Sequence, residues 1–170
     1  MSPIGAEDLY PWVAPDHLLQ ALYELGRQTR GRQAGIDLVR AVAPLLEHED
    51  EDIRQEALRL LLVQWKEPGF RRNAVEMLLG DPSEAVRGTA AFGIASVSTP
   101  VTRREDARAL LEQVRGEAIP LHVRGAAYEG LLIMHRRPEF PPGTREVDPS
   151  VDFDWGWIRE LERNVSETDY

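Results

Sequence analysis

The side chains that most often carry chemistry are few and scattered in this sequence. Its four histidines are His17, His48, His122 and His135. No two of them lie three or four residues apart, the spacing that would place two metal ligands on one helix face. The chain has no cysteine, which excludes thiolate metal sites, disulfides and cysteine nucleophiles. We therefore expect no metal site.

Carboxylates are abundant, but their arrangement does not indicate catalysis. The acidic run at residues 47–52 fits a solvated turn before a helix start, where negative charge is favoured. The sequence contains neither a glycine-rich phosphate loop nor a Gly-x-Ser-x-Gly motif. We expect no catalytic residue, no cofactor and a non-enzymatic function.

The excess negative charge is concentrated in the last part of the sequence. The chain has 20 Lys and Arg against 29 Asp and Glu, a net charge of −9. From Glu139 onward there are nine acids against three bases, so about two thirds of the excess lies there. This asymmetry is typical of an interaction tail. A solvated surface segment would give the same pattern.

Composition places the chain among ordinary globular proteins. Its 170 residues suit one domain, with 42% hydrophobic and 29% charged residues. No stretch approaches the 18 apolar residues of a membrane span, and we expect no contact with a membrane. The first residues lack the basic and apolar regions of a secretory signal. We expect a cytoplasmic location.

A repeated pattern indicates the elements that position these residues. Each unit has a Leu-Leu pair, a polar turn, an aliphatic-Arg pair and then an alanine three residues after the arginine. Periodic apolar positions predict two helices per unit. Arg54 and Arg87 are 33 residues apart, and Arg87 and Arg124 are 37 apart because the third turn contains an insertion. The Leu-Leu pairs are Leu45-Leu46, Leu78-Leu79 and Leu110-Leu111.

This pattern resembles HEAT repeats, including the HEAT-like type of phycobilin lyases, over roughly residues 36–136. The resemblance implies an all-α fold, a short right-handed α-solenoid of about three helical hairpins with atypical capping helices at both ends. It also implies that Arg54, Arg87 and Arg124 tie neighbouring repeats together through acids and carbonyls. The expected organisation is a repeat domain at 1–137, with an N-terminal cap at 1–32 and repeats at about 36–66, 69–98 and 101–136, followed by an acidic proline-containing extension at 138–170 with a short helix at about 154–164.

Two further patterns concern arginine and glycine. Arg71-Arg72 and Arg103-Arg104 lie at matching positions at the start of successive first helices, where cations oppose the helix dipole. They form either a basic ridge, extended by Arg136-Arg137, or ion pairs with neighbouring acids, and we favour the ion pairs. The matched glycines of the second and third units predict close helix–helix approach, because each glycine costs a helix about 1 kcal/mol relative to alanine. These pairs are Gly88 with Gly125 and Gly93 with Gly130.

The candidate partner-binding residues lie on the second helices and in the extension. In HEAT solenoids the second helices line a concave face that binds partners. Arg59, Phe92 and Glu129 occupy one column and differ completely, which fits a surface adapted to a partner and also fits neutral drift. The aromatic residues of the extension either dock back on the repeats or serve as interface anchors. The full set is Gln55, Arg59, Leu62, Phe92, His122, Glu129, Leu132, Phe153, Trp155 and Trp157.

The sequence therefore predicts a protein–protein interaction module, a monomer or weak homo-oligomer that binds another protein through the concave face, the tail or both. Small acidic helical proteins of this kind resemble immunity or antitoxin proteins, which cover a toxic enzyme. One alternative is a HEAT-like nucleic-acid-binding protein or DNA glycosylase. That function needs a basic concave surface, whereas the basic residues here are scattered. A tetrapyrrole chaperone-lyase is a second alternative, implied by the repeat family alone.

Overall fold

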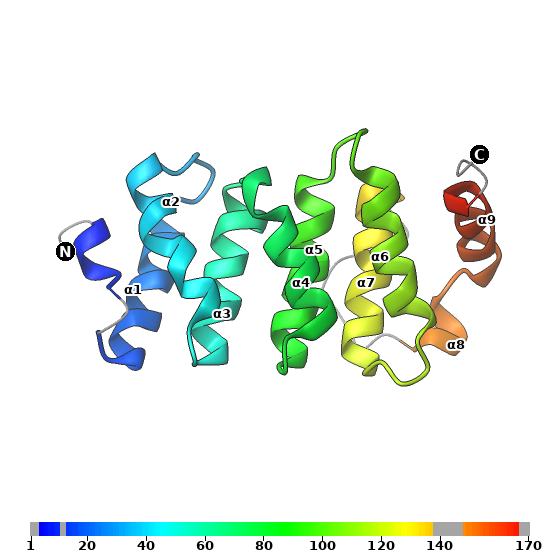
Figure 1. Ribbon diagram of the computed structural model, residues 1–170, viewed down its shortest axis with the longest axis horizontal. Helices are drawn as coiled ribbons and strands as arrows, with labels where there is room; N and C mark the ends of the chain where they lie inside the picture. Colours follow the sequence, from blue (N-terminus) through cyan, green and yellow to red (C-terminus); the bar gives the residue numbers. More distant parts are fainter. Residues whose placement is uncertain (1–3, 11–12, 138–147, 167–170) are drawn as a thin grey trace.

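The computed structural model describes residues 4–10, 13–137 and 148–166, and within them all regular structure is helical. This confirms the predicted all-α class. Figure 1 shows the helices following one another in chain order along the long axis of the molecule. The elements are η1 (Ala6–Asp8), α1 (Pro15–Gln28), α2 (Ile36–Val42), η2 (Ala43–Glu47), α3 (Glu51–Leu58), η3 (Arg59–Gln64), η4 (Pro68–Phe70), α4 (Arg71–Gly80), α5 (Glu84–Val97), α6 (Arg103–Arg115), α7 (Leu121–Met134), α8 (Pro149–Asp152) and α9 (Trp155–Ser166).

Helices that are adjacent in the sequence pack in pairs. The segment η2 packs on α3, α4 packs on α5, and α6 packs on α7. Figure 1 shows α4 in front of α5 and α6 in front of α7. The second helices of successive pairs also contact one another, α3 with α5 and α5 with α7, and α1 extends this row by packing on α3. The hydrophobic core therefore lies between a row of first helices and a row of second helices.

The α4–α5 pair shows why the repeated pattern folds in this way. Leu78, Val86, Ala90 and Ile94 follow helical spacing and are fully buried between the two helices. The start of α5 is fixed by Ser83, whose Oγ accepts a hydrogen bond from the backbone N–H of Val86 at 3.5 Å. Apolar periodicity and an N-terminal cap together determine this hairpin.

The second helix of the first repeat is less regular than the others. After Leu58, α3 continues as the π-helical segment η3, and the N–H of Trp65 donates to the carbonyl of Leu60, five residues earlier, at 2.9 Å. The chain then turns at Lys66, which has a φ of 57°. A π-helical turn is wider than an α-helical turn. Side chains within η3 therefore depart from the positions that regular helical spacing predicts.

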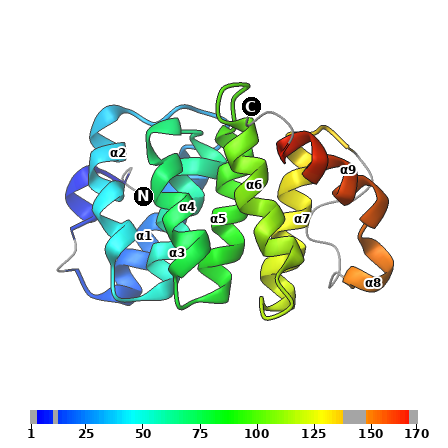
Figure 2. The ribbon, with the colours of Figure 1, turned by 45° about the vertical axis from the view of Figure 1, so that its right-hand side comes forward.

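The C-terminal helices lie at the far end of the molecule, beside α6 and α7 (Figure 2). The predicted short helix corresponds to α9, whose Ile158, Leu161 and Val165 are buried. The proline-containing stretch at 138–147, predicted to be irregular, lies outside the described residues. Among the residues that the structure describes, no helix has the length and apolar character needed to span a bilayer.

Candidate partner-binding surface

The exposed side of the second helices, here called the second-helix face, is formed by α1, α3, α5 and α7. Residues three or four apart share a helix side, and contacts between helices align the four sides. The amide nitrogen of Gln55 donates to Oγ1 of Thr89 at 3.1 Å across the α3–α5 contact. The ring of His122 lies beside Gly88 across the α5–α7 contact. This face includes the predicted residues Gln55, Arg59, Phe92 and His122.

Three apolar or aromatic side chains lie on this face. Tyr23 is 53% exposed, Ile133 is 42% exposed, and Phe92 is half-buried against the core. Tyr23 and Ile133 were not among the predicted residues. A sequence signal for Tyr23 exists, because Tyr23, Glu56 and Thr89 follow one another at 33-residue intervals. It was missed because α1 lacks the aliphatic-Arg pair and was treated only as a cap.

Arg59 lies at the centre of a polar network between α1 and α3. Its Nε and Nη2 donate to the carboxylate of Glu56 at 2.7 and 2.6 Å, and its Nη1 donates to Gln64 at 3.1 Å. Gly26 makes room for the guanidinium, because a Cβ there would lie 2.7 Å from Nη2 of Arg59. The hydrogen bond with Glu56 raises the pKa of Arg59 above its usual value. Arg59 is therefore an ordered, neutralised part of the face rather than a free cation.

Burial and nearby carboxylates determine the protonation state of the Tyr23 hydroxyl. Partial burial, followed by the negative charges of Glu56 and Asp52, raises the pKa of Tyr23 above 10.0. The phenol therefore stays protonated at neutral pH. Tyr23 offers a partner both an aromatic ring and a hydroxyl donor.

Three residues predicted to face away from the core are buried instead. Leu62, Glu129 and Leu132 are 0%, 7% and 2% exposed. Leu62 lies in the π-helical segment and packs against α5, where a Cβ on Gly93 would come within 3.1 Å of it. The helices α3, α5 and α7 also contact neighbours on their sides, so only a narrow strip of each remains exposed. The expectation that these three side chains face away from the core was wrong.

The aromatic residues of the extension dock on α6 and α7. Phe153 is 5% exposed and stacks on Tyr128, with ring centroids 4.4 Å apart. Trp157 meets Tyr128 edge-on at 6.1 Å and the ring of His135 at 5.7 Å. The backbone N–H of Asp154 donates to the Tyr128 hydroxyl at 3.0 Å. Of the two interpretations left open for this segment, the structure shows the one in which it docks back.

Two arginines hold the docked tryptophans in place. The guanidinium of Arg115 lies 5.3 Å from the centre of the half-buried Trp155 ring, and that of Arg137 lies 4.7 Å from the Trp157 ring. These are distances at which cations attract aromatic faces. Phe153 is therefore not presented to a partner, and Trp155 and Trp157 present only part of their surface.

The repeated arginines form a regular series of contacts between neighbouring units. Arg54 donates from Nε and Nη2 to the two carboxylate oxygens of Asp81, both at 2.9 Å. Arg87 donates to Oε1 of Gln113 at 3.0 Å. Asp81 and Gln113 occupy equivalent positions, three residues after the first leucine of their Leu-Leu pairs. Arg54 and Arg87 thus each reach the next unit through an equivalent position.

The same arginines also satisfy carbonyls at the turn inside their own unit. Arg54 donates to His48 and Glu49, Arg87 donates to Leu78, and Arg124 donates to Val114 at 3.1 Å. A planar guanidinium with five N–H donors suits this double role. These contacts are those of structural arginines, which is the role that the repeat resemblance implies.

Three arginines of the candidate basic ridge contact carboxylates, and a fourth contacts a carbonyl. Arg71 donates to Asp106 at 2.5 Å and to Glu105, and Arg72 pairs with Glu76 at 2.9 Å. Arg104 donates to the carbonyl of Val165 at the end of α9 at 2.8 Å. Arg137 lies 3.4 Å from the carboxylate of Asp154. These contacts favour the ion-pair interpretation, in which some of the acids belong to the C-terminal segment.

The described residues contain no group of three or more His, Asp or Glu side chains placed to hold a metal ion. Comparison with known proteins found no family model, curated protein or solved structure that matches this chain.

Proposed function

We propose that this chain is a short HEAT-like α-solenoid that acts in the cytoplasm as a non-enzymatic protein-binding module. The arginine series supports the architecture, because Arg54 and Arg87 contact equivalent positions of successive units. In a solenoid each repeat contacts its sequence neighbours, and the second helices form a continuous surface. An immunity-type inhibitor that covers an enzyme is one form of this function.

The second-helix face is the proposed contact surface. The observation that carries the proposal is that Tyr23, Phe92 and Ile133 lie on one side of α1, α5 and α7 while the leucine-rich side is buried. Aromatic residues surrounded by ordered polar groups are common anchors at protein interfaces. Here the Arg59–Glu56 pair and the Gln55–Thr89 hydrogen bond supply such groups.

The nucleic-acid alternative has less support. A protein that follows a phosphate backbone needs cations free to contact it. Arg71, Arg72 and Arg137 are each engaged by a carboxylate, and Arg59 is engaged by Glu56. On the second-helix face Arg59 is therefore occupied by Glu56, and the exposed Arg159 and Arg163 lie on α9, away from this face.

Site-specific photocrosslinking tests this proposal. A photoreactive benzoylphenylalanine would replace Tyr23 or Phe92, and in the control it would replace Leu79, which is 53% exposed on α4. We expect the two face positions to capture the same protein in cells that express the chain, and we expect Leu79 not to capture it. Capture of the same set of proteins from all three positions would refute the proposal.

Affinity measurements with the purified partner then show how much the second-helix face contributes to binding. Truncation of an aromatic anchor typically costs 2 kcal/mol or more, so Phe92→Ala should weaken binding by at least roughly tenfold. Leu79→Ala should leave the affinity unchanged, because Leu79 lies on the opposite row of helices. Equal losses in the two variants would place the contact elsewhere.

A further inference from the structure

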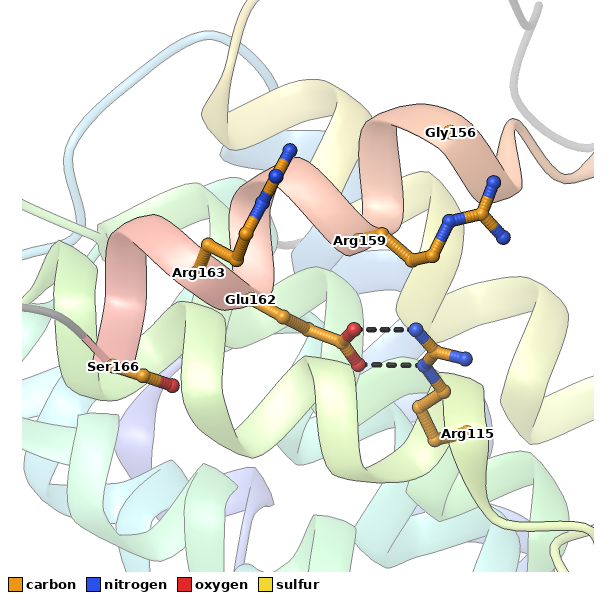
Figure 3. Close-up of a pocket in the computed structure, with 6 residues that line it drawn as sticks. All are labelled: Arg115, Gly156, Arg159, Glu162, Arg163 and Ser166. Carbon is orange, nitrogen blue, oxygen red and sulfur yellow. Dashed lines mark hydrogen bonds and ion pairs between the residues drawn. The ribbon is translucent and has the colours of Figure 1, made fainter.

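A hollow of about 750 Å³ lies against α9 and the end of α6, away from the second-helix face. Its lining contains three arginines, a single carboxylate, a glycine and a serine (Figure 3). The lining residues are Arg115, Gly156, Arg159, Glu162, Arg163 and Ser166. Such a concentration of cations is unexpected in a chain with a net charge of −9.

The position of Arg115 is fixed by two contacts. Its Nε donates to one oxygen of Glu162 at 2.6 Å, and its Nη2 donates to the other. The ring of Trp155 lies beside the same guanidinium. Hydrogen bonding to Glu162 raises the pKa of Arg115, so the guanidinium stays charged. Its Nη1 group has no acceptor among the described residues and remains available as a donor.

The other two arginines are not explained by the fold. Arg159 and Arg163 are exposed, and neither forms an ion pair with the described residues. They lie four residues apart on α9, a spacing at which like charges destabilise a helix by a few tenths of a kcal/mol. Figure 3 shows the side chain of Arg159 reaching to the same side of α9 as Arg115, beside Gly156, whereas the side chain of Arg163 extends from the next turn and points away from Arg115.

Helix α9, which carries Arg159 and Arg163, is held in place by contacts on its opposite side. Ile158, Leu161 and Val165 are buried on the opposite side of α9, and Arg104 donates to the carbonyl of Val165. Gly156 lines the hollow as well. A Cβ there would also lie 3.2 Å from Oδ1 of Asp154, which caps α9 by accepting from the N–H of Trp157.

We propose that this hollow binds a phosphate group, with Arg159 and Nη1 of Arg115 as the donors that reach to one side and Arg163, an exposed side chain able to reorient over the hollow, as the third ligand. The planar guanidinium matches two phosphate oxygens at once, and charge-assisted hydrogen bonds of this kind are the stronger ones. Glu162 neutralises one of the three arginines, which leaves two positive charges for a phosphate dianion. The group is either free phosphate or a phosphorylated side chain of another protein.

The test is a titration with inorganic phosphate at constant ionic strength, followed by NMR of backbone amides and arginine Nε–H groups. Phosphate also stabilises folded proteins by exclusion from their surface, so a rise in melting temperature alone would not identify a site. We expect saturable shifts confined to Arg115, Arg159, Arg163 and Ser166. Shifts spread equally over all exposed arginines would mean non-specific screening and would overturn the proposal.

Arg159 and Arg163 are exposed, so each can be substituted without loss of the fold. We expect Arg159→Gln and Arg163→Gln each to weaken phosphate binding roughly tenfold. Arg72→Gln, on α4, is the matched control and should leave the affinity unchanged. An equal effect of all three substitutions would also overturn the proposal.

A second titration distinguishes the source of the phosphate group. It uses a short phosphoserine peptide and the same peptide without the phosphate. Tighter binding of the phosphopeptide than of inorganic phosphate would identify a phosphorylated protein as the ligand, and equal or weaker binding would identify the free anion. Failure of all these titrations would leave the proposed protein-binding function intact, because the second-helix face lies on other helices.

Discussion

At the scale of single residues, the Arg54–Asp81 pair should be one of the most sensitive contacts between units. The two side chains are only 11% and 6% exposed, and they share two hydrogen bonds. Loss of one partner leaves a largely buried charge with fewer hydrogen bonds. We therefore expect Arg54→Met to lower the free energy of unfolding by about 2–3 kcal/mol, measured by urea denaturation.

An exposed pair on α4 provides the control for this substitution. Arg72 and Glu76 are 88% and 60% exposed, and surface pairs of this kind contribute between about 0 and 1 kcal/mol. Arg72→Met should therefore change the unfolding free energy by no more than about 0.5 kcal/mol. Similar losses in the two variants would contradict a specific role for the repeated arginine.

The contact with Arg54 also changes the pKa of Asp81. Burial alone would raise the pKa of this carboxyl. Hydrogen bonds from Arg54 and from the N–H of Ser83, together with the charge of Arg54, outweigh burial and hold the pKa below its usual value. The stabilisation is therefore present above the unfolded-state pKa and is lost as the pH falls through the lower, folded-state value.

His135 couples the docking of the C-terminal segment to pH. Its ring contacts Trp157, and its Nε2 is buried without a hydrogen-bond partner in the described structure. Burial lowers the pKa of His135 below 6.5, and the positive charges of Arg103 on α6 and of Arg137 lower it further. The folded state therefore favours the neutral ring. The contribution of the neutral His135 ring to the free energy of unfolding is complete above pH 6.5 and is lost as the pH falls below that value.

We expect the wild-type protein to lose stability between pH 7.5 and pH 5.5, and His135→Gln to lose less over the same range. Chemical denaturation monitored by tryptophan fluorescence at the two pH values measures the difference. Both values lie above the range in which most carboxylates titrate. His17→Gln, at an exposed position on α1, is the control. An unchanged pH dependence in His135→Gln would exclude this residue as the origin.

Sequence reasoning predicted the all-α class correctly and failed for side chains whose exposure depends on neighbouring helices. The repeat resemblance implied a structural role for Arg54, Arg87 and Arg124, and the contacts of Arg54 and Arg87 with the next unit agree with it. Exposure of Leu62 was predicted wrongly because nothing in single-sequence periodicity reveals the π-helical turn that begins at Arg59. Leu132 was predicted wrongly because lateral packing between second helices narrows the exposed strip.

At the scale of helices, the second helices approach one another at glycines. The glycine positions differ in whether they can accommodate a side chain. A Cβ at Gly88 would meet Nε2 of His122 at 2.8 Å, and His122 is exposed and able to rotate away. A Cβ at Gly130 would lie 3.2 Å from the backbone carbonyl of Ala91 and 3.3 Å from Leu110. A carbonyl within α5 has little freedom to move.

Alanine substitutions at these two glycines should therefore have opposite effects. Gly88→Ala should raise the unfolding free energy by up to about 1 kcal/mol, the gain in helix propensity. Gly130→Ala should lower it by about 1 kcal/mol, because the steric cost of overpacking exceeds the same gain. Urea denaturation with an unchanged m-value would measure both. Stabilisation of similar size in both variants would mean that α5 and α7 are not packed closely at Gly130.

At the scale of the whole molecule, the order of contacts determines how far a local defect spreads. Helix α1 packs on α3, whereas α5 contacts α3, α4, α6 and α7. In an array with contacts mainly between neighbours, an end can open while the centre remains folded. The repeat pattern predicts contacts in this order within the repeats. Docking of the C-terminal segment was only one of two interpretations of its sequence, because Phe153 and Tyr128 meet through a contact that no repeat encodes.

Two buried positions test this consequence by hydrogen exchange. Leu22 on α1 and Ile94 on α5 are both fully buried, and replacing either by alanine should cost about 2–5 kcal/mol. We expect Leu22→Ala to accelerate amide exchange in α1 and α3 while α7 keeps its protection, because α7 lies two contacts beyond α3. We expect Ile94→Ala to accelerate exchange in every helix from α3 to α7, because α5 joins the two halves. Equal acceleration of α1 and α7 in Leu22→Ala would indicate a single cooperative bundle and would remove the basis for treating the second-helix face as a surface built from successive repeats.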